Sequence, residues 1–375
     1  MKRISIIMSV FALMLGYVNQ INAQGEAAVP FLLLAPDSRH AGLGEAGTGL
    51  ADNSSAIFWN PAGIAFQTGS EVGITHANWL PQFNLDLSYD YVTYRQYIED
   101  IDGSVTASLT YMNYGEFQRT SSSGPEVIGT FNSFDIGATV GYATKLTDDI
   151  GLGVNFRFIY SNLSDQPTEN EVGSGVASTV SFDAGAMWRP ADFLDGNFSI
   201  GLNISNIGPK ISYIDQAQAD PLPTNARIGF AYRVFQDDYN SFTVIGDMSK
   251  LLVNKKTGVL SGVEADSNDV AIAVSNDFMK SIEFSGGAEY WYGRPDDFMF
   301  AVRAGYFYED PDFGARNFMT FGAGIKYDLY GFDFSYISTV GSNSENHPLD
   351  GTLRFSLVIG WDTVPQTKPG LPRGI

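Results

Sequence analysis

The sequence predicts an all-β protein: a transmembrane antiparallel β-barrel of about 14 strands whose lumen holds an N-terminal plug, or hatch. Three observations lead to this prediction. From residue 71 to residue 361 the chain repeats segments in which apolar and polar side chains alternate. After residue 23, no apolar run is long enough for a membrane-spanning helix. The stretch 35–65 lacks alternation and is rich in glycine and turn-forming residues, as expected of a compact segment enclosed by the barrel.

The alternation is clearest in residues 150–161. One face of this segment carries Ile150, Leu152, Val154, Phe156, Phe158 and Tyr160. The opposite face carries Gly151, Gly153, Asn155, Arg157 and Ser161. Soluble β-sandwiches also alternate, but their strands average about five or six residues. The segments here reach the length of about nine to eleven residues that a tilted strand needs to cross a bilayer, and many end in Tyr or Trp, which form interfacial girdles.

Fourteen such segments can be counted, and the connections between them indicate the orientation of the barrel. The segments are 71–79, 85–95, 103–114, 129–144, 149–162, 175–189, 196–208, 223–235, 240–251, 279–292, 298–309, 317–329, 330–340 and 349–361. Connections after even-numbered segments are short, and most of those after odd-numbered segments are long, with 80–84 as the exception. Because outer-membrane barrels have short periplasmic turns and long external loops, we expect both chain termini to be periplasmic.

The predicted organisation is a signal peptide (1–23), a periplasmic or lumenal plug (24–70), the outer-membrane β-barrel (71–361) and a periplasmic C-terminal tail (362–375). The first segment combines a basic start, Lys2-Arg3, with an apolar run and small residues before a cleavage point at Gln24. An uncleaved anchor is the alternative, but the run is shorter than a spanning helix needs. The expected location is the outer membrane of a Gram-negative bacterium.

Composition excludes several classes of function. The 375 residues include no Cys, so disulfides, thiolate nucleophiles and cysteine-based metal sites are ruled out. The chain has 22 Lys and Arg against 42 Asp and Glu, for a formal net charge of −20. This balance argues against nucleic acid as a partner, because phosphates require a basic face.

The run from Gly42 to Gly47 fits the G-x-G-x-x-G pattern of dinucleotide-binding proteins. That pattern has meaning only after a buried strand and at the start of a helix. Here no strand pattern precedes it, and the turn-forming residues 52–55 and Pro61 follow it, so no full-length helix can form. We therefore expect no nucleotide and no other cofactor.

No pattern in the sequence indicates an enzyme. The histidines His40, His76 and His347 have none of the spacings of a metal site and are interpreted as satisfied polar residues. The carboxylate pairs 237–238 and 296–297 fall in predicted short turns, where exposed acids are common. There is no G-x-S-x-G motif, and a hydrolase embedded in the barrel is the remaining enzymatic alternative.

Charged residues on the polar side of the strands are predicted to face the lumen and to find partners there. They are Arg157, Asp183, Arg189, Lys326, Asp328, Asp333 and Arg354. Three plug residues, Arg39, Glu45 and Asp52, are candidate partners. Structural pairing is the simpler interpretation of these charges, and a solute pathway is the alternative.

The candidate site residues form two groups. In the plug they are Asp37, Arg39, Gly42, Gly44, Gly47, Asp52, Trp59, Asn60 and Pro61. In loops expected to bind partners they are Trp79, Leu80, Pro81, Asn206, Pro209, Val270, Ile272 and Val274. The last three belong to the longest loop, 252–278, where a short helix is expected at 269–277. Its apolar residues form either a lid over the mouth of the barrel or a contact for a partner.

Two resemblances to known families follow from particular motifs. Phe58-Trp59-Asn60-Pro61-Ala62-Gly63 resembles an element of the FadL-type outer-membrane barrels, which have an N-terminal hatch. A longer resemblance, over nearly the whole chain after residue 23, is to the PorV family of type IX secretion barrels. It is carried by 30–39, 42–47, 59–62, 78–81, 205–211, 223–229, 247–251, 287–292 and 303–306. The chain departs from the pattern at Gly63, where many relatives have lysine, and in the tail after Trp361, which lacks a terminal aromatic residue. These departures leave a PorQ-type paralogue as an alternative.

The PorV resemblance implies a protein that is not an enzyme. It implies binding of the C-terminal signal domains of secreted cargo and docking at the gate of the large translocon barrel, Sov/SprA-like. Cargo would then pass to the attachment complex with PorU, PorZ and PorQ. If cargo binds at mobile external loops, the expected places are 163–174, 209–222 and 252–278. The alternative function is a FadL-like channel for uptake of hydrophobic small molecules, and in either case outer-membrane lipid surrounds the barrel.

Overall fold

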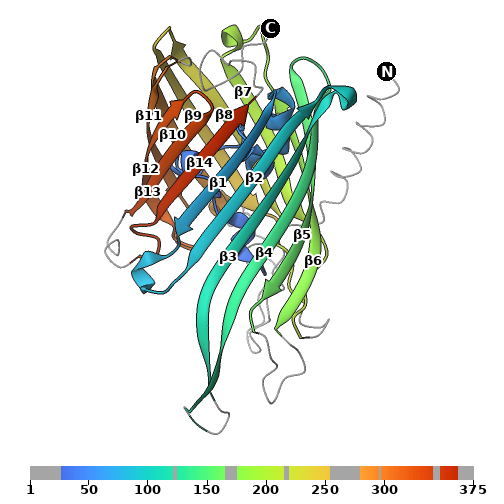
Figure 1. The fold of residues 1–375 in the computed structure, drawn as a ribbon, viewed down its shortest axis with the longest axis vertical. Helices are drawn as coiled ribbons and strands as arrows, with labels where there is room; N and C mark the ends of the chain where they lie inside the picture. Colours follow the sequence, from blue (N-terminus) through green and yellow to red (C-terminus); the bar gives the residue numbers. More distant parts are fainter. Residues whose placement is uncertain are drawn as a thin grey trace, which may run out of the picture.

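The computed structural model describes residues 27–120, 124, 126–164, 175–214, 219–253, 279–294, 297–340 and 347–361. Over these residues the chain forms a closed antiparallel β-barrel (Figure 1). Each strand pairs with its neighbours in sequence, and the last strand closes the barrel by pairing with the first. The strands are β1 (Ser70–Asn78), β2 (Ser88–Ile98), β3 (Gly103–Thr120), β4 (Val127–Lys145), β5 (Ile150–Asn162), β6 (Val176–Trp188), β7 (Phe198–Ile207), β8 (Asn225–Gln236), β9 (Asn240–Leu251), β10 (Ile282–Gly293), β11 (Met299–Tyr308), β12 (Asn317–Tyr327), β13 (Tyr330–Thr339) and β14 (Leu353–Trp361).

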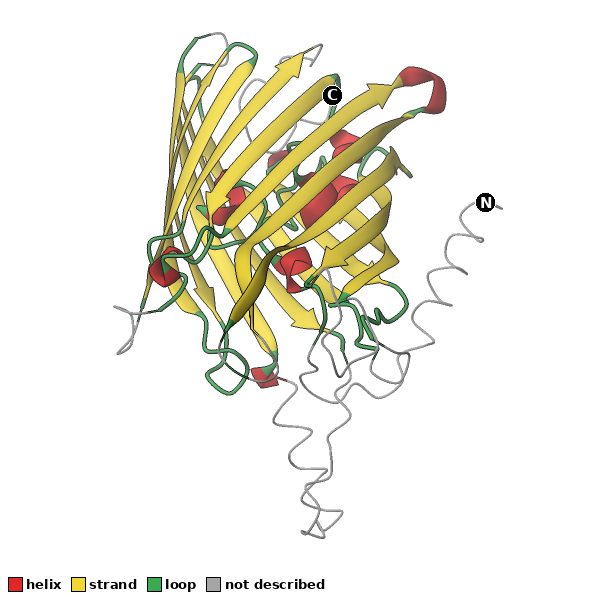
Figure 2. Ribbon diagram, turned by 60° about the horizontal axis from the view of Figure 1, so that its bottom comes forward, coloured by secondary structure: helices red, strands yellow, loops and turns green. Residues whose placement is uncertain are grey.

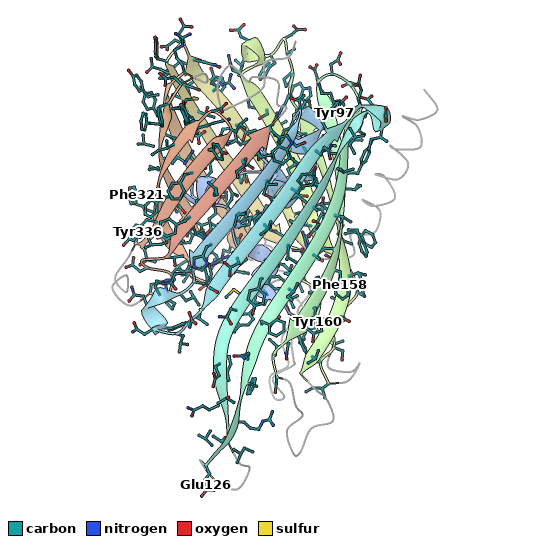
Figure 3. All side chains as sticks on the ribbon, viewed as in Figure 1. Tyr97, Glu126, Phe158, Tyr160, Phe321 and Tyr336 are labelled. Carbon is teal, nitrogen blue, oxygen red and sulfur yellow. The ribbon has the colours of Figure 1, made fainter. Side chains whose placement is uncertain are left out.

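This architecture confirms the predicted fourteen-stranded barrel. The alternation also has the predicted sense. In β5, Val154 and Phe158 are 55% and 46% exposed on the outside, whereas Asn155 and Arg157 between them are buried. Figure 3 shows the same outward direction for Phe158 and Phe321 on opposite sides of the barrel. An apolar outer wall with a polar inner wall is the arrangement of a barrel that lies in lipid.

The two ends of the barrel differ in the length of their connections. At one end, here called the turn end, the connections include 99–102, 146–149, 237–239 and 328–329. Tyr97 marks this end at the top of Figure 3. The opposite end, here called the loop end, carries the longer connections. Among the described residues, no helix is both long enough and apolar enough to cross a membrane.

The long hairpin β3–β4 differs from the prediction, which placed a loop at 115–128. The strands instead continue to Thr120 and resume at Val127, and they extend beyond the loop end of the barrel (Figure 1). A bulge between Asn113 and Gly115 lets the ladder continue, with Gly115 at a φ of 84°. Residues 115–120 and 127–133 are here called the ribbon, and within the described part of the chain their strand pairing is with each other.

Residues 28–67 lie inside the barrel and are here called the plug, drawn largely as red helical turns within the strands of Figure 2. Its elements are the 3₁₀ helices η1 (Pro30–Leu33) and η2 (Pro61–Phe66) and the single-turn helices α2 (Ser38–Ala41) and α3 (Ala56–Trp59). Three more 3₁₀ turns lie in connections: η3 (Pro81–Phe83), η4 (Glu99–Ile101) and η5 (Leu194–Gly196). The short plug helices agree with the prediction that no full-length helix forms there.

An apolar core fills the space between the plug and one side of the wall. Phe31 and Ile57 of the plug pack with Tyr89, Met112 and Ile159 of the strands, and all five side chains are almost fully buried. Close packing of this kind leaves no room for a continuous aqueous path through that side. That side of the lumen is therefore a packed interior, unlike the water-filled channel of a porin.

Candidate functional site

The plug backbone touches the barrel wall at pairs of glycines. Gly44 has a φ of 73°, and a Cβ atom there would lie 2.5 Å from the carbonyl oxygen of Gly286. A Cβ on Gly305 in the wall would lie 2.0 Å from the backbone nitrogen of Gly44. Gly42 meets the wall glycine Gly322 in the same way, at 3.1 Å. The G-x-G-x-x-G run therefore allows the plug backbone to approach the wall closely.

Polar side chains of the wall hydrogen-bond the plug backbone. The Asp247 carboxylate accepts from the backbone N–H groups of Gly47 and Thr48, both at 2.8 Å. These bonds satisfy backbone groups that water cannot reach. The side chains of Asn155 and Asn203 donate to the plug carbonyls of Ile57 and Trp59. The hydroxyls of Thr320 and Ser356 accept from the plug N–H groups of Gly44 and Ser38.

Asn60 and Pro61 place the next turn of the plug against β5 and β6. The Asn60 side chain accepts from the Ala62 N–H at 3.1 Å and donates to the carbonyl of Ala186 on β6 at 3.1 Å. Pro61 lies so close to Gly153 that a Cβ on that glycine would be 2.3 Å from the proline carbonyl carbon. The N-P-A element is thus a contact between the plug and the wall.

A buried ion network holds the plug to β10, β11 and β13. Arg39 binds Asp52 of the plug at 2.6 Å and Glu289 of β10 at 2.7 Å. Glu289 also accepts from Arg303 at 2.6 Å, and Arg303 binds Asp333 at 2.6 Å. Burial acts to lower the pKa of Arg39, but the two carboxylates raise it by more, so the guanidinium stays charged. The network crosses from plug to wall with alternating charges.

Asp37, His40 and Trp59 form a second buried cluster, inside the plug itself. Asp37 caps helix α2, and its carboxylate contacts Nδ1 of His40 at 2.8 Å and accepts from the Trp59 indole N–H at 2.7 Å. Gly47 fits beside both rings, since a Cβ there would lie 2.6 Å from Trp59 and 2.7 Å from His40. His40 is therefore a structural residue of the plug.

The Asp37 cluster gives the plug an acid-sensitive contact. Burial raises the pKa of Asp37, but His40 and the hydrogen bonds from His40 and Trp59 outweigh burial and lower it to about 2. Because the folded-state pKa lies below the unfolded value, the stabilisation is complete above about pH 4 and is lost as the pH falls toward 2. A shift of this size is worth about 2 kcal/mol.

We therefore expect Asp37→Asn to remove part of the acid dependence of stability. Urea unfolding of the purified protein in lipid vesicles, followed by tryptophan fluorescence at pH 7 and pH 3, measures the change. The unfolding free energy of the wild type should fall by about 1 kcal/mol more than that of the variant over this interval, because at pH 3 Asp37 is mostly protonated in the unfolded chain but still mostly ionised in the folded one. Equal decreases in the two proteins would contradict the role assigned to Asp37.

Of the charges predicted to face the lumen, five have the expected surroundings. Arg157 binds Asp183 at 2.7 Å, and Asp333 belongs to the ion network. Arg354 reaches Glu45 of the plug at 3.3 Å, as the pairing of wall and plug charges predicted. Arg189 is also buried and donates to the Leu50 carbonyl of the plug at 2.7 Å.

For Asp328 the prediction was wrong, whereas Lys326 keeps the inward face of β12, opposite the buried Met299. Lys326 is exposed at the end of β12, and Asp328 is exposed in the following two-residue turn with a φ of 51°. Alternation extrapolated past the end of a strand assigns a face to Asp328, which has already left the wall.

Three charged residues of the site were missed in the sequence: Glu289, Arg303 and Asp247. Each falls on the inward face of its strand, between outward residues such as Ala288 and Tyr290 or Val302 and Ala304. The same period-two argument that identified Arg157 would have found them. Their partners in the plug, in contrast, follow only from the folded geometry.

A cavity of about 140 Å³ lies at the loop end of the lumen, between the plug, strands β8 to β11 and the connection 309–316. Glu45 and Trp59 of the plug contribute to its lining. Arg227 from β8 lies with its guanidinium 5.2 Å from the Trp59 ring. Arg316, which binds both Glu283 and Glu309, lines the cavity nearer the rim. The cavity thus has a mixed lining, in which these charged side chains lie beside apolar ones such as Leu33, Leu251 and Phe307.

The candidate partner-binding residues lie in different surroundings. Trp79, Leu80 and Pro81 are half-buried, and the Arg354 guanidinium lies 5.4 Å from the Trp79 ring. Pro209 is exposed. Asn206 is not a surface residue, because it is 1% exposed and its side chain donates to the Pro223 carbonyl at 3.0 Å and accepts from Arg157. Val270, Ile272 and Val274, with the expected helix 269–277, lie outside the described residues.

The fold and the filled lumen define the class of this protein: an outer-membrane β-barrel whose lumen is occupied by its own N-terminal segment. Within that class the chain belongs to the PorV family. The family described as "Type IX secretion system protein PorV" matches residues 18–257, which include the plug and strands β1 to β9. A comparison with curated proteins finds no match.

Solved structures similar to this chain are FadL-type barrels. The toluene transporter TodX of Pseudomonas putida is 11% identical, with 91% of this chain and 98% of TodX covered and a TM-score of 0.50. A second TodX structure is 10% identical, covers 91% and 99%, and has the same TM-score of 0.50. A Pseudomonas aeruginosa FadL homologue is 12% identical, covers 87% and 98%, and has a TM-score of 0.47. At these identities, the likeness to TodX concerns the fold alone.

Proposed function

We propose that this chain is a sealed, non-enzymatic platform of the type IX secretion system. In this proposal it binds C-terminal signal domains of secreted cargo and docks at the gate of the large translocon barrel. It then carries the cargo to the attachment complex that contains PorU, PorZ and PorQ. Membership of the PorV family is the observation that carries the proposal. The chain termini are periplasmic and the loop end faces outward.

The plug supports a platform in preference to a conduit. Ion pairs, backbone hydrogen bonds and glycine contacts join it to strands around the barrel, including β7, β10 and β12. Displacing the plug would break the ion pair between Arg39 and Glu289 and leave a buried charge without its partner, which is energetically costly. A rigid interior suits a protein that presents a surface at its rim while its lumen stays closed.

The ribbon at the loop end supports the placement of a binding surface there. Among the described residues, no further strand lies along its outer edges, because β3 leaves β2 after Asn113 and β4 joins β5 only from Phe134. Phe117, Val127 and Ile128 are 43%, 54% and 59% exposed on it. Unpaired backbone groups beside apolar side chains are the features by which a β-strand of another protein is bound.

Copurification from native membranes tests the proposed function. The tagged protein, extracted in mild detergent, should bring down the translocon barrel and cargo C-terminal domains. Repeated isolation of the barrel alone would refute the proposal. Native mass spectrometry of the same sample distinguishes the proposed function from the alternative. A bound hydrophobic molecule, with no protein partner, would favour a FadL-like channel.

Ile128→Glu should weaken capture of cargo domains without destabilising the barrel. Ile128 lies on the ribbon beyond the part of the barrel that is paired on both sides, so unfolding should be unchanged. A charge at the centre of an apolar contact should lower recovery of cargo about fivefold or more. Leu194→Glu is the matched control, because Leu194 is also exposed but lies in η5 at the turn end. Equal recovery with both variants would exclude the ribbon as the binding surface.

A further inference from the structure

Two ionisable side chains face outward from the wall at β1 and β2. Nδ1 of His76 lies 2.7 Å from Oδ1 of Asp90, and the side chains are 58% and 44% exposed. The two residues are directly opposite each other in the register of the strands. Thr75 and Tyr91, the neighbouring residues on the other face, are buried toward the lumen. The His76–Asp90 pair is therefore on the face that elsewhere meets lipid.

The surroundings of this pair are apolar on three sides. Toward the turn end, the next outward pair is Ile74 and Val92, which are 48% and 41% exposed. In the same row, His76 is flanked by Phe355 on β14 and Asp90 by Tyr111 on β3. Beyond the pair, toward the loop end, β14 still presents the apolar residue Leu353 opposite Asn78. The row that contains the pair is therefore inside the apolar band.

The next outward row continues the polar character on β1, β2 and β3. Asn78, Ser88 and Asn113 lie opposite one another there. Elsewhere the middle of the outer wall presents apolar side chains, for example Val140, Val154, Phe182, Ile228 and Val302. Ionisable residues in a membrane are disfavoured against lipid chains and mark functional positions.

The loop that joins β1 to β2 has the opposite character. Phe83 and Leu85 are 52% and 57% exposed in it, at the end of the barrel where water is expected. Polar groups thus lie where lipid chains would be, and apolar groups lie where water would be. A protein surface that covers both positions resolves the two mismatches together, because it supplies hydrogen bonds to the pair and apolar contact to the loop.

We propose that the outer face of β1 and β2, with the loop 79–87, is a lateral interface with a second membrane-embedded β-barrel protein of different sequence. The partner strand presents a hydrogen-bond donor, such as Arg, Lys or Gln, at the depth of the pair. Among the described residues, Oδ2 of Asp90 and Nε2 of His76 have no hydrogen-bond partner, so both are available to it. This interface rests on the proposed function and deepens it by naming the face that docks.

Substitution of the pair distinguishes an interface from a lipid-facing surface, because the two have opposite expected effects on assembly and on stability. In the double variant His76→Leu, Asp90→Leu, the barrel becomes a better match for lipid, so its resistance to urea should be unchanged or higher. Recovery of the partner barrel by copurification should fall about tenfold or more. Ser178→Leu on β6 is the matched control, since it is also an exposed outward polar residue and should leave recovery unchanged.

Site-specific photo-crosslinking in intact cells locates the contact. p-Benzoylphenylalanine at Val92, beside the pair, should crosslink to a larger membrane protein. The same probe at Val154 on β5, an outward valine remote from the pair, should not. Crosslinks only to lipid, or only to a second copy of this chain, would overturn the inference.

The copurification separates failure of this inference from failure of the proposed function. If the wild type recovers the translocon and the double variant recovers it equally well, the interface is refuted and the proposed function stands. If the wild type recovers no partner barrel, the proposed function fails and the interface with it.

Discussion

Glu289→Ala should destabilise the folded protein by about 3 kcal/mol, because it leaves two buried guanidinium groups with reduced compensation. Arg39 donates to the Glu289 carboxylate at 2.8 Å and 2.7 Å, and Arg303 donates at 2.6 Å. Each arginine retains one other carboxylate, Asp52 or Asp333, so the network is weakened and not abolished. The midpoint of urea unfolding in lipid vesicles, monitored by tryptophan fluorescence, measures the effect.

An exposed ion pair is the control for Glu289. Asp312 binds Lys280 at 2.5 Å near the loop end, with side chains that are 65% and 44% exposed. Asp312→Ala should leave the unfolding midpoint unchanged, since solvent screens such pairs. If both variants unfolded at the same urea concentration as the wild type, the result would show that the ion network does not stabilise the plug.

Gly305→Val should displace the plug from the wall and open the lumen to ions. The added Cβ would lie 2.0 Å from the backbone nitrogen of Gly44 and 2.3 Å from the carbonyl carbon of Leu43. These are backbone atoms that cannot rotate away, so the cost is expected at the upper end of overpacking, about 3 kcal/mol or more. Conductance of the protein in planar lipid bilayers should rise from a closed baseline in the wild type to measurable ion current.

The neighbouring residue supplies a matched control for Gly305. Ala304 is adjacent on β11 but faces outward and is exposed, so Ala304→Val adds a similar volume to the lipid side. It should alter neither conductance nor stability. A Gly305→Val protein that remains closed and as stable as the wild type would show that the wall glycines are not needed for plug contact.

Much of the barrel follows from period-two alternation, because one face of each strand meets lipid and the other meets the lumen. Val154 and Arg157 were assigned to the correct faces on that basis. The length of β3 and β4 was not predicted, since beyond the membrane the ribbon has no lipid face to impose an apolar pattern. Glu116 and Gln118 are exposed strand residues that resemble loop residues in the sequence.

The contacts of the plug were the least predictable part of the site. Arg39 was recognised as a charge in need of a partner, but its binding to Glu289 joins residues 250 positions apart. Local pattern contains no information about which inward residue of which strand lies beside the plug. Asn206 shows a different error. It was expected in a loop that binds partners, whereas a bulge in the β6–β7 pairing accompanies its burial against Asp183.

The order of the chain has a consequence for biogenesis. Ser38 and Gly44 of the plug bind residues 318 and 276 positions later, on the last and third-last strands. During synthesis these backbone groups have no final partners until almost the entire polypeptide has been made. The plug can therefore become fully ordered only after the last strands have been made and paired. A truncated product without β14 would lack Ser356, which binds Ser38, and Arg354, which binds Glu45. Contacts between residues so far apart in sequence favour slow folding, and an incomplete barrel cannot hold its plug in the final position.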